Sequence, residues 1–170
     1  ATILLKIKDS KTEKLYNMDI SIHSPALEIT SCIMDDTTLG DGDYIADPGE
    51  TFNLIFRIKN EGSSDASGQF LISSPTADLT ILQPNVKSGV LKFGETTDIP
   101  ITVKLSESIN SGTIISVYST LNCSPFVISK DFTFRAGRIR ESFEASSFNI
   151  FPWINNSTTP WILSSASPYD

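Results

Sequence analysis

One stretch of the chain concentrates side chains that could do chemistry. Residues 39–50 read LGDGDYIADPGE, so that four acidic residues stand among three glycines and one proline. Carboxylates this close together repel one another unless a cation neutralises them, and Ca²⁺ accepts irregular cages of oxygen ligands. The sequence therefore predicts a candidate calcium site at Asp41, Asp43 and Asp47, with no other cofactor.

The same stretch is also typical of a turn. In Asp47-Pro48-Gly49-Glu50, proline would set φ at the second position and glycine would take positive φ at the third. An EF-hand is excluded, because a loop numbered from Asp41 has Ala46 where that motif needs glycine. A plain turn and an irregular calcium loop both stay open.

The residues needed for covalent catalysis do not form a motif. Nucleophilic catalysis needs a base beside the nucleophile, and His23 is the only histidine. Cys32 lies in the middle of a predicted strand, and neither cysteine has the flanking residues of a nucleophile motif. We predict that this chain has no catalytic residue and is not an enzyme.

The two cysteines, Cys32 and Cys123, are far apart in the sequence and match no metal-binding spacing. A bridge between them would close a long loop and stabilise an exported protein by about 4 kcal/mol. Free cysteine is also a common small residue of protein cores. A disulfide and two buried thiols therefore both stay open.

The net charge of −7 sets limits on the partners of this chain. A polyanion would be repelled, so we expect no nucleic-acid partner. No run of 18 apolar residues and no charged-then-apolar leader is present, so we expect neither a membrane span nor a signal peptide. A strand pattern from the first residues on indicates a piece of a longer protein.

Period-two alternation, interrupted by turn residues about every ten positions, predicts an all-β fold. We expect a hairpin of strands 2–8 and 14–23, ended by Ser24-Pro25, and then an immunoglobulin-like Greek-key β-sandwich of about seven or eight strands. In TFNLIFRIKN, Phe52, Leu54, Phe56 and Ile58 fall on one buried face. The predicted sandwich strands are 27–34, 51–60, 69–73, 79–82, 89–93, 97–105, 113–121 and 126–135. A turn is expected at residues 61–68, EGSSDASG.

The composition changes from Gly137 onward, where both tryptophans lie and lysine is absent. We predict an irregular C-terminal tail, too short for a core of its own. Its aromatic residues Phe151, Trp153 and Trp161 have two interpretations. They could stack on sugar rings, or they could be core residues of a domain that continues elsewhere.

The segment ALEITSCIMDDTTLGDGDYIADPGETFNLIFRIKNEGSSDASGQF resembles the CARDB-like immunoglobulin-type modules of secreted Bacteroidetes proteins. The resemblance covers roughly residues 25–135. ESFEASSFNIFPW, residues 141–153, is similar to the opening of a gingipain-type cleaved adhesin or MAM-like domain. Modules of this kind follow the catalytic domain of exported gingipain-like or subtilisin-like peptidases as spacers and adhesive parts.

We therefore expect three regions: the last hairpin of a preceding domain (1–24), a CARDB-like sandwich (25–136) and the truncated start of an adhesin-like or jelly-roll domain (137–170). The resemblance implies a non-catalytic structural or adhesive accessory module, outside the cell or on its surface. Neighbouring domains, and a cell-surface protein or glycan, would be its partners. The alternative is a carbohydrate-binding module that uses the C-terminal aromatic residues.

Overall fold

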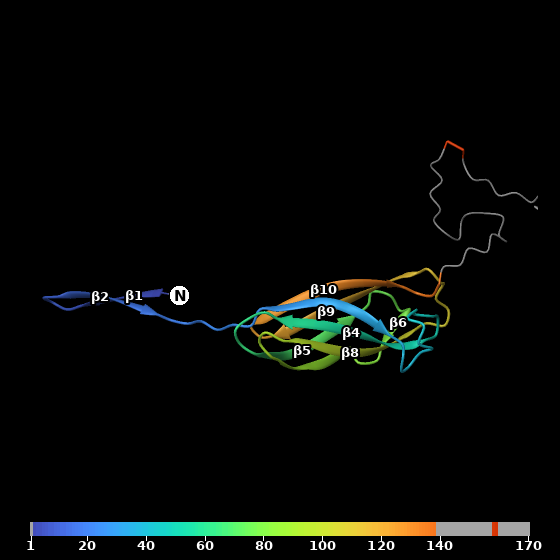
Figure 1. The fold of residues 1–170 in the computed structure, drawn as a ribbon, viewed down its shortest axis with the longest axis horizontal. Helices are drawn as coiled ribbons and strands as arrows, with labels where there is room; N and C mark the ends of the chain where they lie inside the picture. Colours follow the sequence, from blue (N-terminus) through green and yellow to red (C-terminus); the bar gives the residue numbers. More distant parts are fainter. Residues whose placement is uncertain (1, 139–157, 160–170) are drawn as a thin grey trace, which may run out of the picture.

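The computed structural model describes residues 2–138 and 158–159, and these residues form an all-β structure with ten strands and no helix (Figure 1). No described helix is therefore long and apolar enough to cross a membrane. The strands are β1 (Thr2–Lys8), β2 (Glu13–Asp19), β3 (Leu27–Asp35), β4 (Thr51–Asn60), β5 (Ala66–Ser73), β6 (Leu79–Ile81), β7 (Asn85–Leu91), β8 (Thr96–Leu105), β9 (Ile114–Cys123) and β10 (Phe126–Arg135).

The first two strands form the predicted N-terminal hairpin, which pairs with itself as a two-stranded sheet (Figure 1). The Asp9 side chain accepts hydrogen bonds from the backbone N–H groups of Lys11 and Thr12, at 2.7 Å each, and so closes the turn. These bonds lower the pKa of Asp9. Strand β2 is shorter than predicted, because its pairing with β1 ends where Asp19 meets Thr2.

Strands β3 to β10 form two antiparallel four-stranded sheets, in the orders β3-β4-β8-β6 and β10-β9-β5-β7. These orders match the ABED and GFC sheets of immunoglobulin domains, with β7 added beside β5. The sandwich therefore has eight strands, and the predicted all-β sandwich class is confirmed.

The core lies between the two sheets and is filled by alternate side chains. On β4, Phe52, Leu54, Phe56 and Ile58 are at most 1% exposed, as the alternation predicted. The Phe56 ring meets rings from the opposite sheet edge-to-face, with centroids 5.0 Å from Phe70 and 5.8 Å from Phe132. Such aromatic contacts add to the stability that burial alone gives.

The buried side-chain amide of Asn60 forms hydrogen bonds where the chain enters the sandwich. The Asn60 side chain donates to the carbonyl oxygens of Ser64 (2.9 Å) and Leu91 (3.0 Å). Its Oδ1 accepts from the backbone N–H groups of Ala26 (3.2 Å) and Gly62 (3.1 Å). A polar group can be buried at low cost only when it is hydrogen-bonded in this way.

Two strands of the sandwich begin at least three residues before their predicted first residues. Residues 61–68 were predicted as a turn, but β5 begins at Ala66 and contains a register shift between Ser67 and Gln69. Gly68 lies at this bulge, where a Cβ atom would stand 2.0 Å from the carbonyl oxygen of Asn122. The glycine therefore permits a close approach to β9 within a strand, whereas the sequence suggested a turn.

The start of β7 was also predicted too late, at residue 89 rather than Asn85. Its residues Asn85 and Lys87 are polar and exposed, which an edge strand beside β5 tolerates without cost. Of the predicted C-terminal region 137–170, only residues 137, 138, 158 and 159 are described, so the tail and the adhesin-like domain lie outside the described residues.

Phe56→Ala is expected to lower the free energy of unfolding by about 3–5 kcal/mol, because it removes a ring of β4 that packs against Phe70 and Phe132 of the opposite sheet. The measurement is urea unfolding followed by intrinsic fluorescence. Phe93→Ala is the matched control, since Phe93 is 60% exposed. Its effect should stay within about 0.5 kcal/mol. Equal losses in the two variants would contradict this description of the core.

Candidate functional site

The acidic loop joins β3 to β4 and begins at a buried carboxylate. Asp36 directly follows β3 and is 0% exposed. Its Oδ2 accepts a hydrogen bond of 2.9 Å from the backbone N–H of Tyr44. Tyr44 has a φ of 61°, a backbone conformation that residues other than glycine rarely adopt. The backbone of the loop is therefore strained next to this carboxylate.

Two further carboxylates of the loop lie beside Asp36. Asp41 Oδ1 accepts from the backbone N–H of Asp43 at 3.2 Å, and Asp43 Oδ1 accepts from that of Ile45 at 2.9 Å. The other oxygen of Asp43 forms an ion pair of 2.7 Å with the guanidinium of Arg138. The loop is therefore linked to a residue that follows the last strand of the sandwich.

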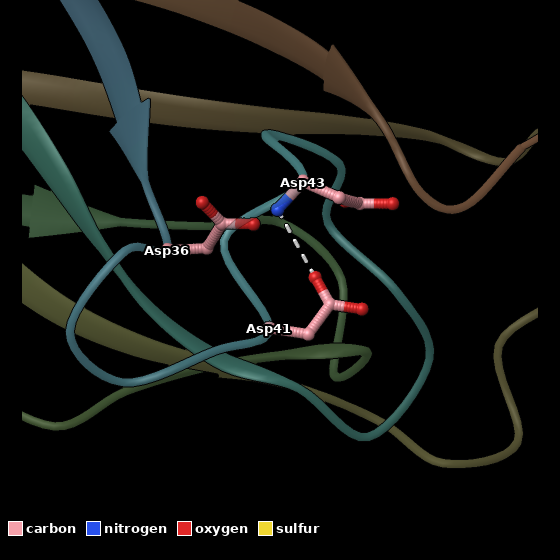
Figure 2. A group of neighbouring side chains, drawn as sticks. All are labelled: Asp36, Asp41 and Asp43. Atoms are coloured by element: carbon pink, nitrogen blue, oxygen red, sulfur yellow. Dashed lines mark hydrogen bonds between the residues drawn. The ribbon is translucent and has the colours of Figure 1, made fainter.

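Asp36, Asp41 and Asp43 are neighbours that come from separate parts of the loop (Figure 2). One oxygen from each residue lies within 4.8 Å of the other two. Asp36 Oδ1 is buried and has no hydrogen-bond partner among the described residues. An unpaired buried carboxylate oxygen is costly, and no other buried side-chain oxygen or nitrogen of the described residues lacks a partner.

Glu50 organises the loop from its C-terminal end. Its carboxylate accepts from the backbone N–H of Asp41 at 3.2 Å and from that of Asp47 at 2.8 Å. Gly40 lies against this carboxylate, and a Cβ atom there would stand 1.9 Å from Glu50 Oε1. The loop thus needs both a carboxylate at position 50 and no side chain at position 40.

The predicted turn at Asp47-Pro48-Gly49-Glu50 is confirmed. The backbone N–H of Glu50 donates to the carbonyl oxygen of Asp47 at 3.1 Å, and Gly49 has a φ of 83°. Asp47 lies in this turn and is not a member of the group of three carboxylates. The turn and the acidic group are therefore two neighbouring features of one loop.

Of the three predicted ligands, the structure brings Asp41 and Asp43 together and adds Asp36 in place of Asp47. The missed residue had a signal in the sequence. Cys32 and Met34 pack against the core, and Asp36 continues their alternation. An acid at an inward position after a strand indicates a buried carboxylate, whereas the glycine-rich pattern indicates the acids further along the loop.

The described residues do not bring His23 and the cysteines together as a catalytic pair. His23 lies in the exposed segment between β2 and β3. Cys32 is in β3, five positions beyond its first residue, which places it about 16 Å further along the strand. Cys123 is buried in β9, in the opposite sheet.

Both cysteines are free thiols, so of the two alternatives the disulfide is not formed. Burial raises the pKa of Cys32 to about 12 and also raises the pKa of Cys123. Cys32 packs against the core and Cys123 belongs to it, and thiols with a raised pKa carry little thiolate character near neutral pH.

The outer surface of the sandwich carries open hollows. One is lined by Arg57, Thr96 and Asp98. The guanidinium of Arg57 makes two hydrogen bonds of 2.9 Å to the Asp98 carboxylate, and these bonds lower the pKa of Asp98. The two charged groups neutralise each other, so this hollow offers no free charge to a ligand.

The aromatic residues proposed as ligand-binding, Phe151, Trp153 and Trp161, lie outside the described residues. Their assignment to sugar binding therefore remains a prediction from the sequence.

No protein-family model matches the chain, and no curated protein matches its sequence. Among solved structures, it is similar to a FixG-related protein from Vibrio parahaemolyticus, with 14% identity and a TM-score of 0.41 over 66% of this chain and 95% of that chain. It is also similar to AvmM, which catalyzes macrocyclization in alchivemycin A biosynthesis, with 11% identity and a TM-score of 0.41 over 69% of this chain and 91% of that chain. A family 123 glycoside hydrolase from Clostridium perfringens matches with 11% identity and a TM-score of 0.38 over 54% of this chain and 21% of that chain. Similarities this low support no inference about function.

Glu50→Ala is expected to lower the free energy of unfolding by about 1–3 kcal/mol, because two backbone N–H groups of the loop lose their acceptor. Urea unfolding measures the loss, and faster amide hydrogen exchange at Asp41 and Asp47 locates it. Glu95→Ala is the control, since Glu95 is an exposed acid in the turn before β8. A loss no greater than that of the control would show that Glu50 does not organise the loop.

Both thiols should react at least about tenfold more slowly in the native chain than in denaturant when an aromatic disulfide reagent is added at about pH 8. The reason is that the pKa of Cys32 is about 12 in the folded chain, against an ordinary value of 9.0. The released thiolate is followed by absorbance. Two thiols should react after unfolding. Fast reaction of the native chain, or none after unfolding, would contradict two free thiols that are shielded by the fold.

Proposed function

We propose that this chain is a non-catalytic structural and adhesive accessory module of an exported multidomain bacterial protein, where it spaces neighbouring domains. A gingipain-like or subtilisin-like peptidase is the parent that the CARDB-like sequence resemblance favours. The partners would be neighbouring domains of the same polypeptide and a cell-surface protein or glycan.

The observation that carries this proposal is the path of the chain through the sandwich. The chain enters beside Asn60, the last residue of β4, where the Glu61 N–H donates to the Ala26 carbonyl at 2.8 Å. It leaves beside the start of β4, where the Gly137 N–H donates to the Ala46 carbonyl at 2.7 Å. Entry and exit therefore lie at opposite ends of the sandwich (Figure 1), roughly 30 Å apart along a ten-residue strand.

The interior of the sandwich supports a structural rather than a catalytic role. The space between the sheets is occupied by packed apolar side chains, whereas an enzyme needs a concave pocket with convergent polar groups. The only histidine of the chain is exposed in a linker, and both cysteines are free thiols whose pKa is raised by burial.

The N-terminal hairpin supports contact with a neighbouring domain. Leu5 is paired with Tyr16 across the hairpin, so these side chains share one face with Ile7 and Met18. All four are between 46% and 54% exposed. A two-stranded sheet is marginal on its own, and an apolar face of this kind is stabilised when another domain covers it.

Spin labels at Ser24→Cys and Thr133→Cys, in a chain with both native cysteines replaced by alanine, test the spacing. Pulsed dipolar spectroscopy is expected to give one narrow distance on the order of 30 Å, since the labels stand near opposite ends of the sandwich. A short or broad distribution would remove the spacer role.

The unlabelled chain should leave a broad peptide panel uncut, and cleavage that is lost in His23→Ala would identify an enzyme instead.

The alternative, a carbohydrate-binding module, rests on the aromatic residues of the tail. Glycan-array binding that is lost in Trp153→Ala or Trp161→Ala would favour it over the spacer.

A further inference from the structure

We propose that Asp36, Asp41 and Asp43 bind one Ca²⁺, and that the bound ion fixes the loop between β3 and β4 against the segment that leaves the sandwich. The inference does not depend on the spacer function, because it concerns the chemistry of the loop alone.

The buried oxygen of Asp36 is the first reason. Asp36 is 0% exposed, yet within the part of the chain that the structure describes its Oδ1 has no hydrogen-bond partner, while its Oδ2 accepts from the backbone N–H of Tyr44. The Asp36 side chain extends toward the part of the loop that carries Asp41 and Asp43 (Figure 2). A carboxylate oxygen that is buried without a donor is stabilised when it coordinates a cation.

The spacing of the three carboxylates is the second reason. Two oxygens that bind the same Ca²⁺ at about 2.4 Å can lie at most about 4.8 Å apart. One oxygen from each of the three residues meets this limit. Three carboxylates at this distance repel one another strongly, and a divalent cation removes most of that repulsion.

The donor set selects among cations. All three side chains offer hard oxygen atoms, which suit Ca²⁺ and Mg²⁺, and neither a thiolate nor an imidazole belongs to the group. Mg²⁺ demands a nearly ideal octahedron at about 2.1 Å, whereas Ca²⁺ accepts irregular cages completed by carbonyl oxygens and water. An irregular loop with widely spaced carboxylates therefore favours Ca²⁺.

The loop is held in place by groups outside the ion site. Glu50 accepts the backbone N–H groups of Asp41 and Asp47, and Gly40 leaves the space that the Glu50 carboxylate occupies. These contacts position the backbone before any ion binds. The entropic cost of ordering the ligands is thus met largely by the fold, which favours binding.

Asp43 connects the ion site to the exit of the chain. Its Oδ2 is paired with Arg138 at 2.7 Å, and the backbone N–H of Gly137 donates to the carbonyl oxygen of Ala46. Ala46 and Ala136 also form a parallel β-bridge. An ion that holds Asp43 in place therefore also restrains Arg138, at the point where the chain leaves the sandwich.

Thermal unfolding of the full chain tests the site. At equal ionic strength, CaCl₂ is expected to raise the melting midpoint over that in chelator, by roughly 10 °C when free Ca²⁺ exceeds the dissociation constant a hundredfold. MgCl₂ should have a clearly smaller effect. No rise with CaCl₂ would overturn the proposal, and an equal rise with MgCl₂ would overturn the assignment to calcium.

Isosteric variants identify the ligands. Asp36→Asn, Asp41→Asn and Asp43→Asn are each expected to weaken Ca²⁺ binding at least tenfold by isothermal titration calorimetry. Asp47→Asn, which removes the same charge from the same loop, should bind within twofold of the unaltered chain. Retained binding in Asp41→Asn, or a tenfold loss in Asp47→Asn, would overturn the ligand set. Asp41 is exposed, so its variant is informative even if Asp36→Asn does not fold.

A second readout separates coordination from an ordinary structural role of Asp36. In chelator, Asp36→Asn should melt at the same temperature as the unaltered chain or higher, because the substitution removes a buried charge that two other carboxylates repel. In CaCl₂ it should melt lower. A lower midpoint in both solutions, together with unaltered Ca²⁺ binding in Asp41→Asn, would show that Asp36 only supports the fold.

Limited trypsin digestion tests the link to the exit segment. Ca²⁺ is expected to slow cleavage after Arg138 several-fold, while cleavage after Lys11 in the turn of the hairpin stays unchanged. The Lys11 site also corrects for any effect of Ca²⁺ on the protease. Equal rates at Arg138 with and without Ca²⁺ would overturn the restraint of the exit segment.

Discussion

The packing of one strand, β4, against the opposite sheet is the constraint on which the structure depends. Its inward side chains alternate without interruption from Phe52 to Asn60, so that one face of the strand is buried along its whole length. Phe56 meets Phe70 and Phe132 from the other sheet, and Phe52 meets Phe134 at 5.8 Å. Because burial of apolar surface is the main force in folding, these contacts set the distance and register of the two sheets.

The two ends of the sandwich bury polar side chains with opposite outcomes. At the entry end, the amide of Asn60 makes four hydrogen bonds and joins β4 to the neighbouring turns. At the exit end, Asp36 is equally buried, but no group of residues 2–138 or 158–159 donates a hydrogen bond to one of its oxygens. The first arrangement stabilises the fold by itself. In the second, the unpaired buried oxygen is unfavourable, and a bound cation would stabilise it. Cation binding is therefore expected at this end of the sandwich.

Much of the fold could be predicted because the relevant information is local. Alternation along the chain gave the exact bounds of β4 and β10, and the residues of Asp47-Pro48-Gly49-Glu50 predicted their turn. Prediction was weaker where the conformation of a residue depends on a contact with a residue far away in the sequence. Gly68 looked like part of a turn, but it lies at a bulge in β5 because the backbone of Asn122 in β9 leaves no space for a side chain.

The sequence by itself determined the sandwich class, the buried face of β4 and the presence of an acidic loop, because side-chain alternation and turn residues act over a few positions. Only the tertiary structure decided which acids meet. Asp36 replaces Asp47 in the group, and Arg138 reaches Asp43 from 95 positions away. Such contacts depend on how the sheets are ordered and on where the chain leaves them, and local sequence patterns do not encode either of these.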